Sequence, residues 1–270
     1  MIRENYHTHT YRCRHAQGDV DDYLSEAERQ GLAVLGFSEH MPTPDKDFNH
    51  PKIHMPMSEV PRYVDSVRAA ASRWDTVDVR LGGECDYLKL YHNYYLDELL
   101  GENGFDYLLL STHFIDVSDE WIFFDQLVTA KQLAAYTDQS ITAMQSGLFS
   151  CFVHPDCFML GYGIWDDQAR SCTTALIEAA KEYDVLLELN SKGFRLAGID
   201  DPKDMYQARY PNRNFWEMVA SINPVALFGS DAHMPSLVGS HITLCETFVK
   251  DLGITLMGVH NSHTSSRFVS

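Results

Sequence analysis

Residues 225–233 read Val225-Ala226-Leu227-Phe228-Gly229-Ser230-Asp231-Ala232-His233, a short apolar run that ends in a carboxylate and an imidazole. Three earlier apolar runs end in the same way, leading to Ser38-Glu39-His40, to Ser111-Thr112-His113 and to His154-Pro155-Asp156. A single histidine at the end of a strand is more often a hydrogen-bonded residue at the rim of the barrel than a metal ligand. Four runs that deliver polar groups at the same end predict a shared polar cluster at the carboxyl ends of the strands, where barrels place their active sites.

Apolar runs alternate with helical patterns along the whole chain. The predicted strands are Tyr6–Thr10, Ala33–Ser38, Val77–Cys85, Tyr107–Ser111, Cys151–His154, Val185–Asn190 and Val225–Ser230. Helical spacing of apolar residues occurs in Val20–Gly31, Ser58–Trp74, Gln132–Ser146 and Asp167–Tyr183. A strand–helix unit repeated about seven times predicts a parallel sheet. With polar groups gathered at one end of the strands, a closed barrel fits this length better than an open sheet.

The composition is that of an ordinary globular α/β protein, with 45% apolar and 22% charged residues in 270. We find no repeat and no linker, so we expect one domain over residues 1–270, with Pro42 to Pro61 as one long loop. No apolar run reaches about 18 residues and the start lacks a signal-peptide core, so no membrane span and a cytoplasmic location are expected. The net charge of −17 argues against nucleic acid or anionic lipid as a partner.

Two residue types point to the chemistry. The six cysteines show no Cys-x-x-Cys spacing, which predicts free and mostly buried thiols rather than disulfides. The thirteen histidines are the unusual feature, since lysine and arginine together number only 21. This excess of imidazole predicts metal binding.

The first predicted strand holds His7-Thr8-His9, in which residues i and i+2 face the same side. Asp231 and His233 repeat this spacing at the last strand, and Glu84 ends another apolar run with two oxygens that could bridge two cations. A lone His-x-His pair is a weak signal, but the pair combined with Asp-x-His and isolated strand-end histidines is a strong one. Imidazoles with a few carboxylates and no thiolate suit Zn, Fe, Mn or Co better than Ca or Mg.

In this order, the motifs resemble those of the PHP (polymerase and histidinol-phosphatase) superfamily of metal-dependent phosphoesterases. The matching segments are His7-Thr8-His9, Arg12-Cys13-Arg14-His15-Ala16, Ser38-Glu39-His40, Gly83-Glu84, Ser111-Thr112-His113, His154-Pro155-Asp156 and Ser230-Asp231-Ala232-His233. Residues 10–16, 84–87 and 189–195 are most similar to the monofunctional histidinol-phosphate phosphatases.

The resemblance implies a distorted (β/α)7 barrel with three divalent transition-metal ions at its carboxyl-terminal mouth. It implies one ion held by His7, His9, Glu84 and Asp231, a second held by Glu84, His113 and His154, and a third held by His15, His40 and His233. The residue pattern reaches most of these ligands independently, and the resemblance adds His15 and the grouping. Ligand types leave the metal open among Zn, Fe, Mn and Co, and the oligomeric state is open too.

Several side chains carry further predictions. Asp231 and His233 are assigned as catalytic residues. Arg195 is predicted to grip phosphate in a bidentate manner, with a surface ion pair as its alternative. Lys192 is a second candidate for substrate binding, and a solvated side chain is its alternative. Two carboxylates lie next to predicted ligands: Glu39 is expected to be structural, and Asp156 either orients an imidazole or begins a turn. The histidines of polar stretches, His50, His54 and His92, are expected to be exposed.

Three functions fit these features. The leading one is hydrolysis of histidinol phosphate in histidine biosynthesis, with a metal-activated hydroxide as the nucleophile and a small phosphomonoester as the only partner. The second is another PHP phosphoesterase, such as a nucleotide phosphodiesterase or other phosphomonoesterase. The net negative charge of the chain argues against a long nucleic acid as its substrate. The third is a non-catalytic metal-binding module. Phosphate release from a monoester against a diester discriminates among them.

Overall fold

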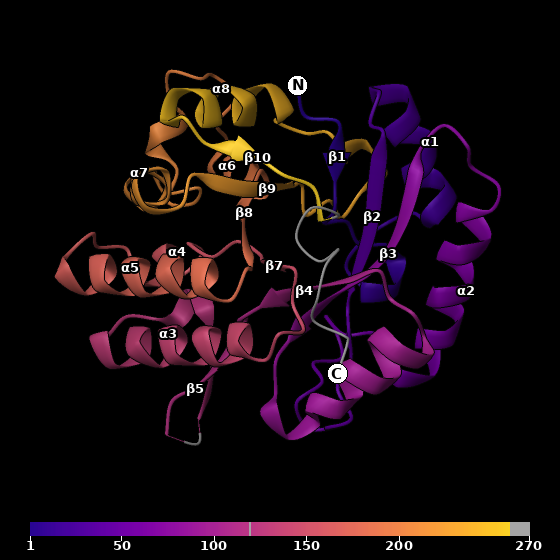
Figure 1. Cartoon of the computed structure of the whole chain (residues 1–270), viewed down its shortest axis with the longest axis horizontal. Coiled ribbons are helices and arrows are strands. Elements are labelled where there is room, and N and C mark those ends of the chain that lie inside the picture. Colours follow the sequence, from indigo (N-terminus) through magenta and orange to yellow (C-terminus); the bar gives the residue numbers. More distant parts are fainter. Residues whose placement is uncertain (119, 260–270) are drawn as a thin grey trace.

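The computed structural model describes residues 1–118 and 120–259, which form a single curled sheet surrounded by helices (Figure 1). The sheet has eight parallel strands in the order β1-β2-β3-β4-β7-β8-β9-β10. Their bounds are β1 Glu4–Asn5, β2 Val34–His40, β3 Asp78–Asp86, β4 Tyr107–Ser111, β7 Cys151–Phe152, β8 Leu186–Asn190, β9 Val225–Gly229 and β10 Thr255–Leu256. A separate antiparallel hairpin, β5 (Phe114–Asp116) with β6 (Trp121–Phe123), follows β4.

The first and last motifs of the sequence meet where the sheet curls round. Thr8 forms a parallel bridge with Ala232, and His9 N–H donates to the Ala232 carbonyl at 2.9 Å. The predicted distorted barrel is therefore confirmed, and its seven predicted strands correspond to β1, β2, β3, β4, β7, β8 and β9. The eighth strand, β10, was not predicted because two residues are too short for a periodic signal.

The predicted first strand, Tyr6–Thr10, is wrong in its bounds. The ladder of β1 pairs only Glu4 and Asn5 with β2, ahead of the two histidines. The Asn5 side chain explains the early end, because its Oδ1 accepts hydrogen bonds from His7 N–H and Ser230 N–H, both at 3.1 Å. The side chain thus replaces main-chain ladder bonds, and the His7–His9 segment runs extended without being a regular strand.

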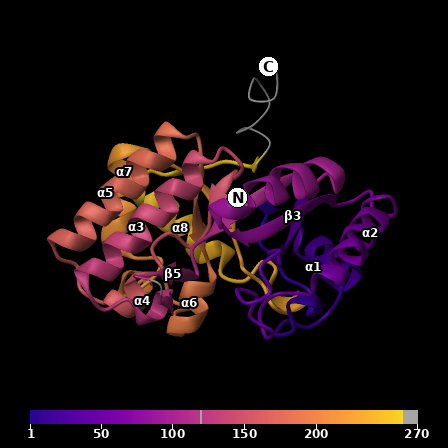
Figure 2. The same cartoon turned by 90° about the horizontal axis from the view of Figure 1, so that it is seen from below.

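Helices cover the outside of the sheet on two flanks, with α1 and α2 on one and α3, α5, α7 and α8 on the other (Figures 1 and 2). The four predicted helical patterns correspond to α1 Val20–Gln30, α2 Val60–Ala71, α3 Ala130–Gln145 and α5 Asp167–Glu182. Four further helices are α4 Met159–Tyr162, α6 Lys192–Ala197, α7 Arg213–Ile222 and α8 Ile242–Leu252, and a π-helix spans Tyr94–Glu102. Within the described ranges, no helix is long and apolar enough to cross a membrane.

An apolar cluster fills the inside of the sheet below the strand ends, and Tyr6 and Tyr107 are its largest members. The Tyr107 hydroxyl donates to the Tyr6 carbonyl at 2.6 Å. A Cβ at Gly36 would lie 2.1 Å from that hydroxyl oxygen, and a Cβ at Gly82 would lie 2.2 Å from Tyr107 Cζ. Only glycine on β2 and β3 leaves room for this ring, which closes the bottom of the barrel and keeps its polar mouth separate.

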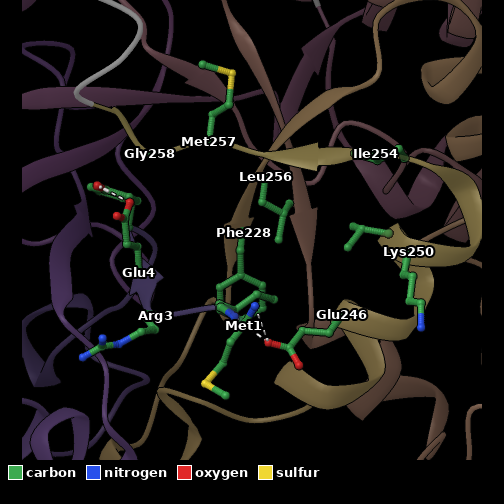
Figure 3. A pocket seen from close by; sticks show the side chains of 13 residues that line it. Met1, Arg3, Glu4, Phe228, Glu246, Lys250, Ile254, Leu256, Met257 and Gly258 are labelled. Atoms are coloured by element: carbon green, nitrogen blue, oxygen red, sulfur yellow. Dashed lines mark hydrogen bonds and ion pairs between the residues drawn. The ribbon is translucent and has the colours of Figure 1, made fainter.

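A hollow of about 810 Å³ lies away from the predicted site, between β1, β10 and α8 (Figure 3). Met1, Phe228, Leu256 and Met257 contribute its apolar lining, and no predicted metal ligand lines it. All six cysteines are buried and free, as predicted.

Candidate metal centre

The alternation of side chains along the strands carries the predicted ligands to the inside of the barrel. Every second residue of a strand faces the same side, so a residue at an even spacing from an inward-facing one also faces inward. This relation holds for His40, counted from Val34 in β2, and for Glu84, counted from Gly82 in β3. It also holds for His113, counted from Leu109 in β4, and for Asp231, counted from Leu227 in β9. Strand ladders align β2 with β3 so that His40 stands opposite Glu84. The same edge of the sheet therefore presents all four groups.

His154 breaks this alternation. Cys151 and Val153 belong to the inner cluster, so a regular strand would direct His154 outward. Its backbone instead enters the left-handed region, with φ of 35°, and its Nε2 lies 3.0 Å from Glu84 Oε1. Asp231 also has a positive φ, 47°. Such strained residues persist where the surrounding structure holds them, and they cluster at functional sites.

The side chains predicted to hold the first ion lie close together. Nε2 of His7 and Nε2 of His9 lie 3.0 Å apart, and each lies 3.4 Å from Glu84 Oε2. Asp231 Oδ1 lies 3.4 Å from His9 Nε2 and 3.9 Å from His7 Nε2. Donor atoms that share a tetrahedral zinc ion, with bonds of about 2.0–2.1 Å, are separated by roughly 3.3–3.4 Å. The four side chains are thus spaced as the ligands of one ion.

Glu84 turns its other oxygen toward a second group. Its Oε1 lies 3.0 Å from His154 Nε2 and 3.3 Å from His113 Nε2. His40 Nδ1 lies 2.9 Å from Glu84 Oε2. The two oxygens of this carboxylate therefore face five imidazoles between them. A carboxylate that bridges two metal ions requires this arrangement.

The third group lies nearest to solvent. His15, which is exposed, follows a short 3-10 turn at Tyr11–Cys13 and has its Nε2 2.8 Å from His233 Nε2. Ligand atoms of His15, His40 and His233 all lie within 4.8 Å of one another. The Nδ1 atoms of His15 and His233 lie 2.8 and 3.1 Å from the backbone carbonyls of Cys13 and Asp231, so each Nε2 is left free for a ligand bond.

Buried atoms without hydrogen bonds show that the centre suits cations. Glu84 Oε2 and Asp231 Oδ1 are buried within 3.4 Å of imidazole nitrogens, yet neither accepts a hydrogen bond from any described residue. A buried carboxylate oxygen without a partner is costly. A cation among these nitrogens and oxygens would satisfy both atoms, so the residues present fit a metal centre.

The protonation equilibria follow from burial and from crowding of charge. Burial, with neighbouring imidazoles, lowers the pKa of His9 well below its usual range and that of His40 to about 3. Burial alone would raise the pKa of Glu84, but His40, His7 and His113 hold it well below its usual value. Burial likewise would lower the pKa of His7, but Glu188, Glu84 and Asp231 raise it well above normal. The deprotonated carboxylates and the neutral His9 and His40 are the states that bind metals.

Two carboxylates behind the ligands were missed by sequence reasoning. Glu188 on β8 is fully buried, and its Oε1 lies 2.7 Å from His7 Nδ1. Asp86 Oδ2 lies 3.1 Å from His113 Nδ1, and its Oδ1 accepts the His113 N–H at 2.7 Å. Each orients an imidazole so that the opposite nitrogen faces the centre. The available signal was a carboxylate inside an apolar run, as in Leu186-Leu187-Glu188-Leu189.

The two predicted substrate-binding cations lie in different surroundings. Lys192 Nζ lies 2.9 Å from Asp231 Oδ2, and Lys192 lines the hollow at the mouth. Arg195 donates to Ser240 Oγ at 2.6 Å and to the Asp231 carbonyl at 3.1 Å. It is absent from the described lining of that hollow. In this structure Lys192 presents its charge to the site and Arg195 supports the backbone of Asp231.

The hollow at the mouth measures about 210 Å³. Metal-ligand side chains form one wall, and apolar or aromatic side chains form the other: Ile53, Phe123, Phe124, Leu160, Leu196 and Tyr210. Ile53 comes from the predicted long loop, and the two phenylalanines come from the end of the β5–β6 hairpin and the turn after it. Such a space suits a small ligand with one charged and one apolar end.

Three subsidiary predictions are settled by the contacts. Glu39 is structural as expected, because it is buried and accepts the Thr10 N–H at 2.7 Å. Asp156 contacts no imidazole ring of the described residues by a hydrogen bond: it accepts from Asn212 N–H at 2.5 Å and from Trp216 Nε1 at 3.1 Å, and burial raises its pKa to about 7. His54 is buried rather than exposed, because it packs on Phe48 and Phe114.

Fold and site define a class: a parallel α/β barrel with a centre of imidazoles and carboxylates at the carboxyl ends of its strands. A family model described as the PHP domain matches residues 5–192, which is more than half of the chain. The protein belongs to the PHP domain family.

Similar proteins agree with this assignment. A probable histidinol-phosphatase of Deinococcus radiodurans is 28% identical over 256 residues, with 92% of each chain covered. Another, of Schizosaccharomyces pombe, is 24% identical over 277 residues, covering 92% of this chain and 86% of the relative. The histidinol phosphate phosphatase of Lactococcus lactis, solved with zinc, L-histidinol and phosphate, superposes with a TM-score of 0.73 at 17% identity, covering 94% of this chain and 95% of that one. It shares the fold.

Proposed function

We propose that this protein is a metal-dependent phosphoric monoester hydrolase that converts L-histidinol phosphate to L-histidinol and phosphate in histidine biosynthesis. The observation that carries the proposal is the convergence of the nine predicted ligands at the mouth of the barrel, next to a small hollow with one apolar wall. The two probable histidinol-phosphatases that match most of the chain support the choice of substrate.

The proposed centre holds three divalent ions, of Zn, Fe, Mn or Co. The ligand groups are His7, His9, Glu84 and Asp231; Glu84, His113 and His154; and His15, His40 and His233. When bound, such ions supply Lewis acidity, which neutralises phosphate charge and makes a water acidic enough to act as a nucleophile near neutral pH. The zinc in the Lactococcus lactis structure supports this class of metal.

The chain's own residues bind and orient the substrate. The Lys192 side chain, which is 31% exposed, adds a positive charge beside Asp231 where a phosphate oxygen would approach. Phe123 and Phe124 offer flat apolar surfaces for the imidazole end of the substrate. The backbone of Asp231, held by Arg195, fixes the carboxylate that we assign with His233 to catalysis. A direct phosphate contact from Arg195 stays a prediction.

The test is phosphate release by protein reconstituted with Zn, Mn, Co or Fe. We expect L-histidinol phosphate to be hydrolysed faster than p-nitrophenyl phosphate, and the diester bis-p-nitrophenyl phosphate slowest. A matched control is Glu246→Gln, since Glu246 lies against the amino terminus, away from the centre. Preference for the diester would favour the alternative PHP phosphoesterase function. Absence of turnover with every metal would favour a non-catalytic metal-binding module.

A further inference from the structure

Glu188 occupies an unusual place in the barrel. It lies on β8 between Leu186 and Asn190, which share its inward orientation, and it is fully buried. Leu186 belongs to the apolar cluster that fills the bottom of the barrel, whereas Asn190 donates to Glu188 Oε2 at 2.8 Å. The carboxylate therefore lies at the boundary between the apolar interior and the polar mouth.

One oxygen of Glu188 sets the ring of His7. A carboxylate can only accept hydrogen bonds, so at 2.7 Å His7 Nδ1 must carry the hydrogen. The opposite nitrogen, Nε2, then faces His9, Glu84 and Asp231. A neutral His7 in this tautomer has its lone pair on Nε2, where the first group of ligands converges.

The other oxygen supports a different part of the centre. Glu188 Oε2 accepts the backbone N–H of His154 at 2.9 Å. This is the residue whose left-handed backbone, with φ of 35°, brings its ring to Glu84 Oε1. The hydrogen bond gives the N–H at this break in the strand a partner, and so supports the conformation that His154 needs.

The neighbouring strand leaves room for this carboxylate at one glycine. A Cβ on Gly229 of β9 would lie 1.7 Å from Glu188 Oε1 and 3.0 Å from His7 Cβ. Any other residue at position 229 would displace Glu188 or His7. The glycine of β9, the carboxylate of β8 and His7, which follows β1, are thus packed against one another.

We propose that Glu188 is a positioning residue that serves two metal sites at once, fixing the tautomer of His7 in the first and the backbone of His154 in the second. The inference rests on the proposed metal centre and adds a coupling between two of its sites. The site of His15, His40 and His233 has no contact with Glu188 in the described residues, so it should be independent of it.

Glu188→Gln is the decisive variant. Three donors point at Glu188, namely His7 Nδ1–H, His154 N–H and Asn190 Nδ2–H. Glutamine has one acceptor oxygen, so its amide NH₂ must oppose a donor on one side. Either His7 changes tautomer, which places a hydrogen on Nε2, or His154 loses its partner. We expect a roughly 10–100-fold loss of zinc affinity at the affected sites, as typical for carboxylates that orient ligands.

The experiment is a competitive zinc titration of the full chain against a chromophoric chelator, with zinc content measured in parallel. Gly229→Ala is an independent second variant, which should reproduce the loss by pushing Glu188 aside. Asp156→Asn is the matched control, because Asp156 is also a buried carboxylate with two donors but contacts α7 and its amino-terminal cap. Both donors reach the same oxygen, Oδ2, so the asparagine oxygen can accept from both, and zinc affinity should be unchanged. Unfolding in excess chelator verifies that each variant is folded.

Selective weakening of one or two sites, with the third intact, would support the inference. Equal zinc affinity of Glu188→Gln, Gly229→Ala and the unaltered protein would overturn it while leaving the metal centre standing. Uniform weakening of all three sites, matched by Asp156→Asn, would also overturn it, since that pattern indicates a structural role alone. An unaltered protein that binds no zinc, manganese, cobalt or iron would refute the metal centre and this inference together.

Discussion

Replacing Glu84 by glutamine should remove two ions from the centre while leaving the fold intact. Glu84 Oε2 faces His7, His9 and His40, and Oε1 faces His113 and His154. The glutamine amide keeps the shape but carries no charge and only one oxygen. The site with two remaining imidazoles should lose its ion first, and the site that keeps His7, His9 and Asp231 should be weakened.

The magnitude follows from ligand linkage. A site held at a free metal concentration 100 times its Kd adds about 2.7 kcal/mol to the free energy of unfolding. Loss of two such sites removes about 5 kcal/mol, which for a chain of this size lowers Tm by roughly 10–20 °C. In excess chelator, the decrease in Tm caused by Glu84→Gln should be much smaller. Removing the buried charge removes its desolvation cost and also its attraction to the imidazoles, and these two contributions oppose each other.

Metal content by elemental analysis and calorimetric unfolding, each with and without chelator, measure these quantities. Glu246→Gln serves as the control, since it removes a carboxylate near the amino terminus rather than at the mouth. We expect about three metal equivalents in the unaltered protein and about one in Glu84→Gln, with kcat/KM reduced more than about 100-fold. Three equivalents and an unchanged metal-dependent rise in Tm in Glu84→Gln would refute the bridging role.

Other predictions test the rest of the site and one surface contact. A chelator should abolish phosphate release and added Mn, Co or Zn should restore it, whereas turnover that resists chelation would contradict the metal mechanism. Lys192→Met and Arg195→Ala separate the two predicted phosphate contacts: the true contact should lose about 2–4 kcal/mol in kcat/KM, and the geometry favours Lys192. Hydrogen bonding from Trp74 and Arg73 lowers the pKa of Asp21, so its stabilising effect is present above the unfolded-state pKa and is lost as pH falls through the folded-state pKa. Because Asp21 is largely exposed, Asp21→Asn should cost under about 1 kcal/mol at pH 7 and nothing in acid, as measured by denaturant unfolding; an undiminished effect in acid would contradict this.

The sequence predicts the barrel, and which side chains meet at its mouth, because both depend on regular geometry. Apolar runs mark the strands, and the parallel arrangement brings their ends to one edge, so the sequence alone places His40, Glu84 and His113 together. The first strand shows the limit of this reasoning. Its histidines do reach the centre, yet the ladder stops at Asn5, whose side chain substitutes for main-chain hydrogen bonds. Periodicity carries no information on such a substitution.

What could not be predicted depends on contacts across strands. The hydrogen bonds that Glu188 accepts from His7 and from the His154 backbone join residues 181 and 34 positions apart. Arg195 and Lys192 lie three residues apart in one helix, which places them near one another on its surface. Lys192 lines the hollow, whereas Arg195 donates to Ser240 Oγ, a partner 45 residues further along the chain. The burial of His54 likewise results from aromatic packing by Phe48 and Phe114, which are distant from each other in the chain.

The closure of the barrel and the assembly of the metal centre are one event in physical terms. His7 and His9 lie near the start of the chain and Asp231 follows the last long strand. The bridge of Thr8 with Ala232 and the hydrogen bond from Ser230 N–H to Asn5 Oδ1 join these segments. The carboxylates of Glu84, Glu188 and Asp231 lie around His7, next to this bridge. Like charges this close repel one another where no cation lies between them. In the proposed centre, a bound cation would attract carboxylates from both sides of the bridge. Metal binding should therefore stabilise the closed barrel as a whole, since the ligands of the first site come from both sides of the seam.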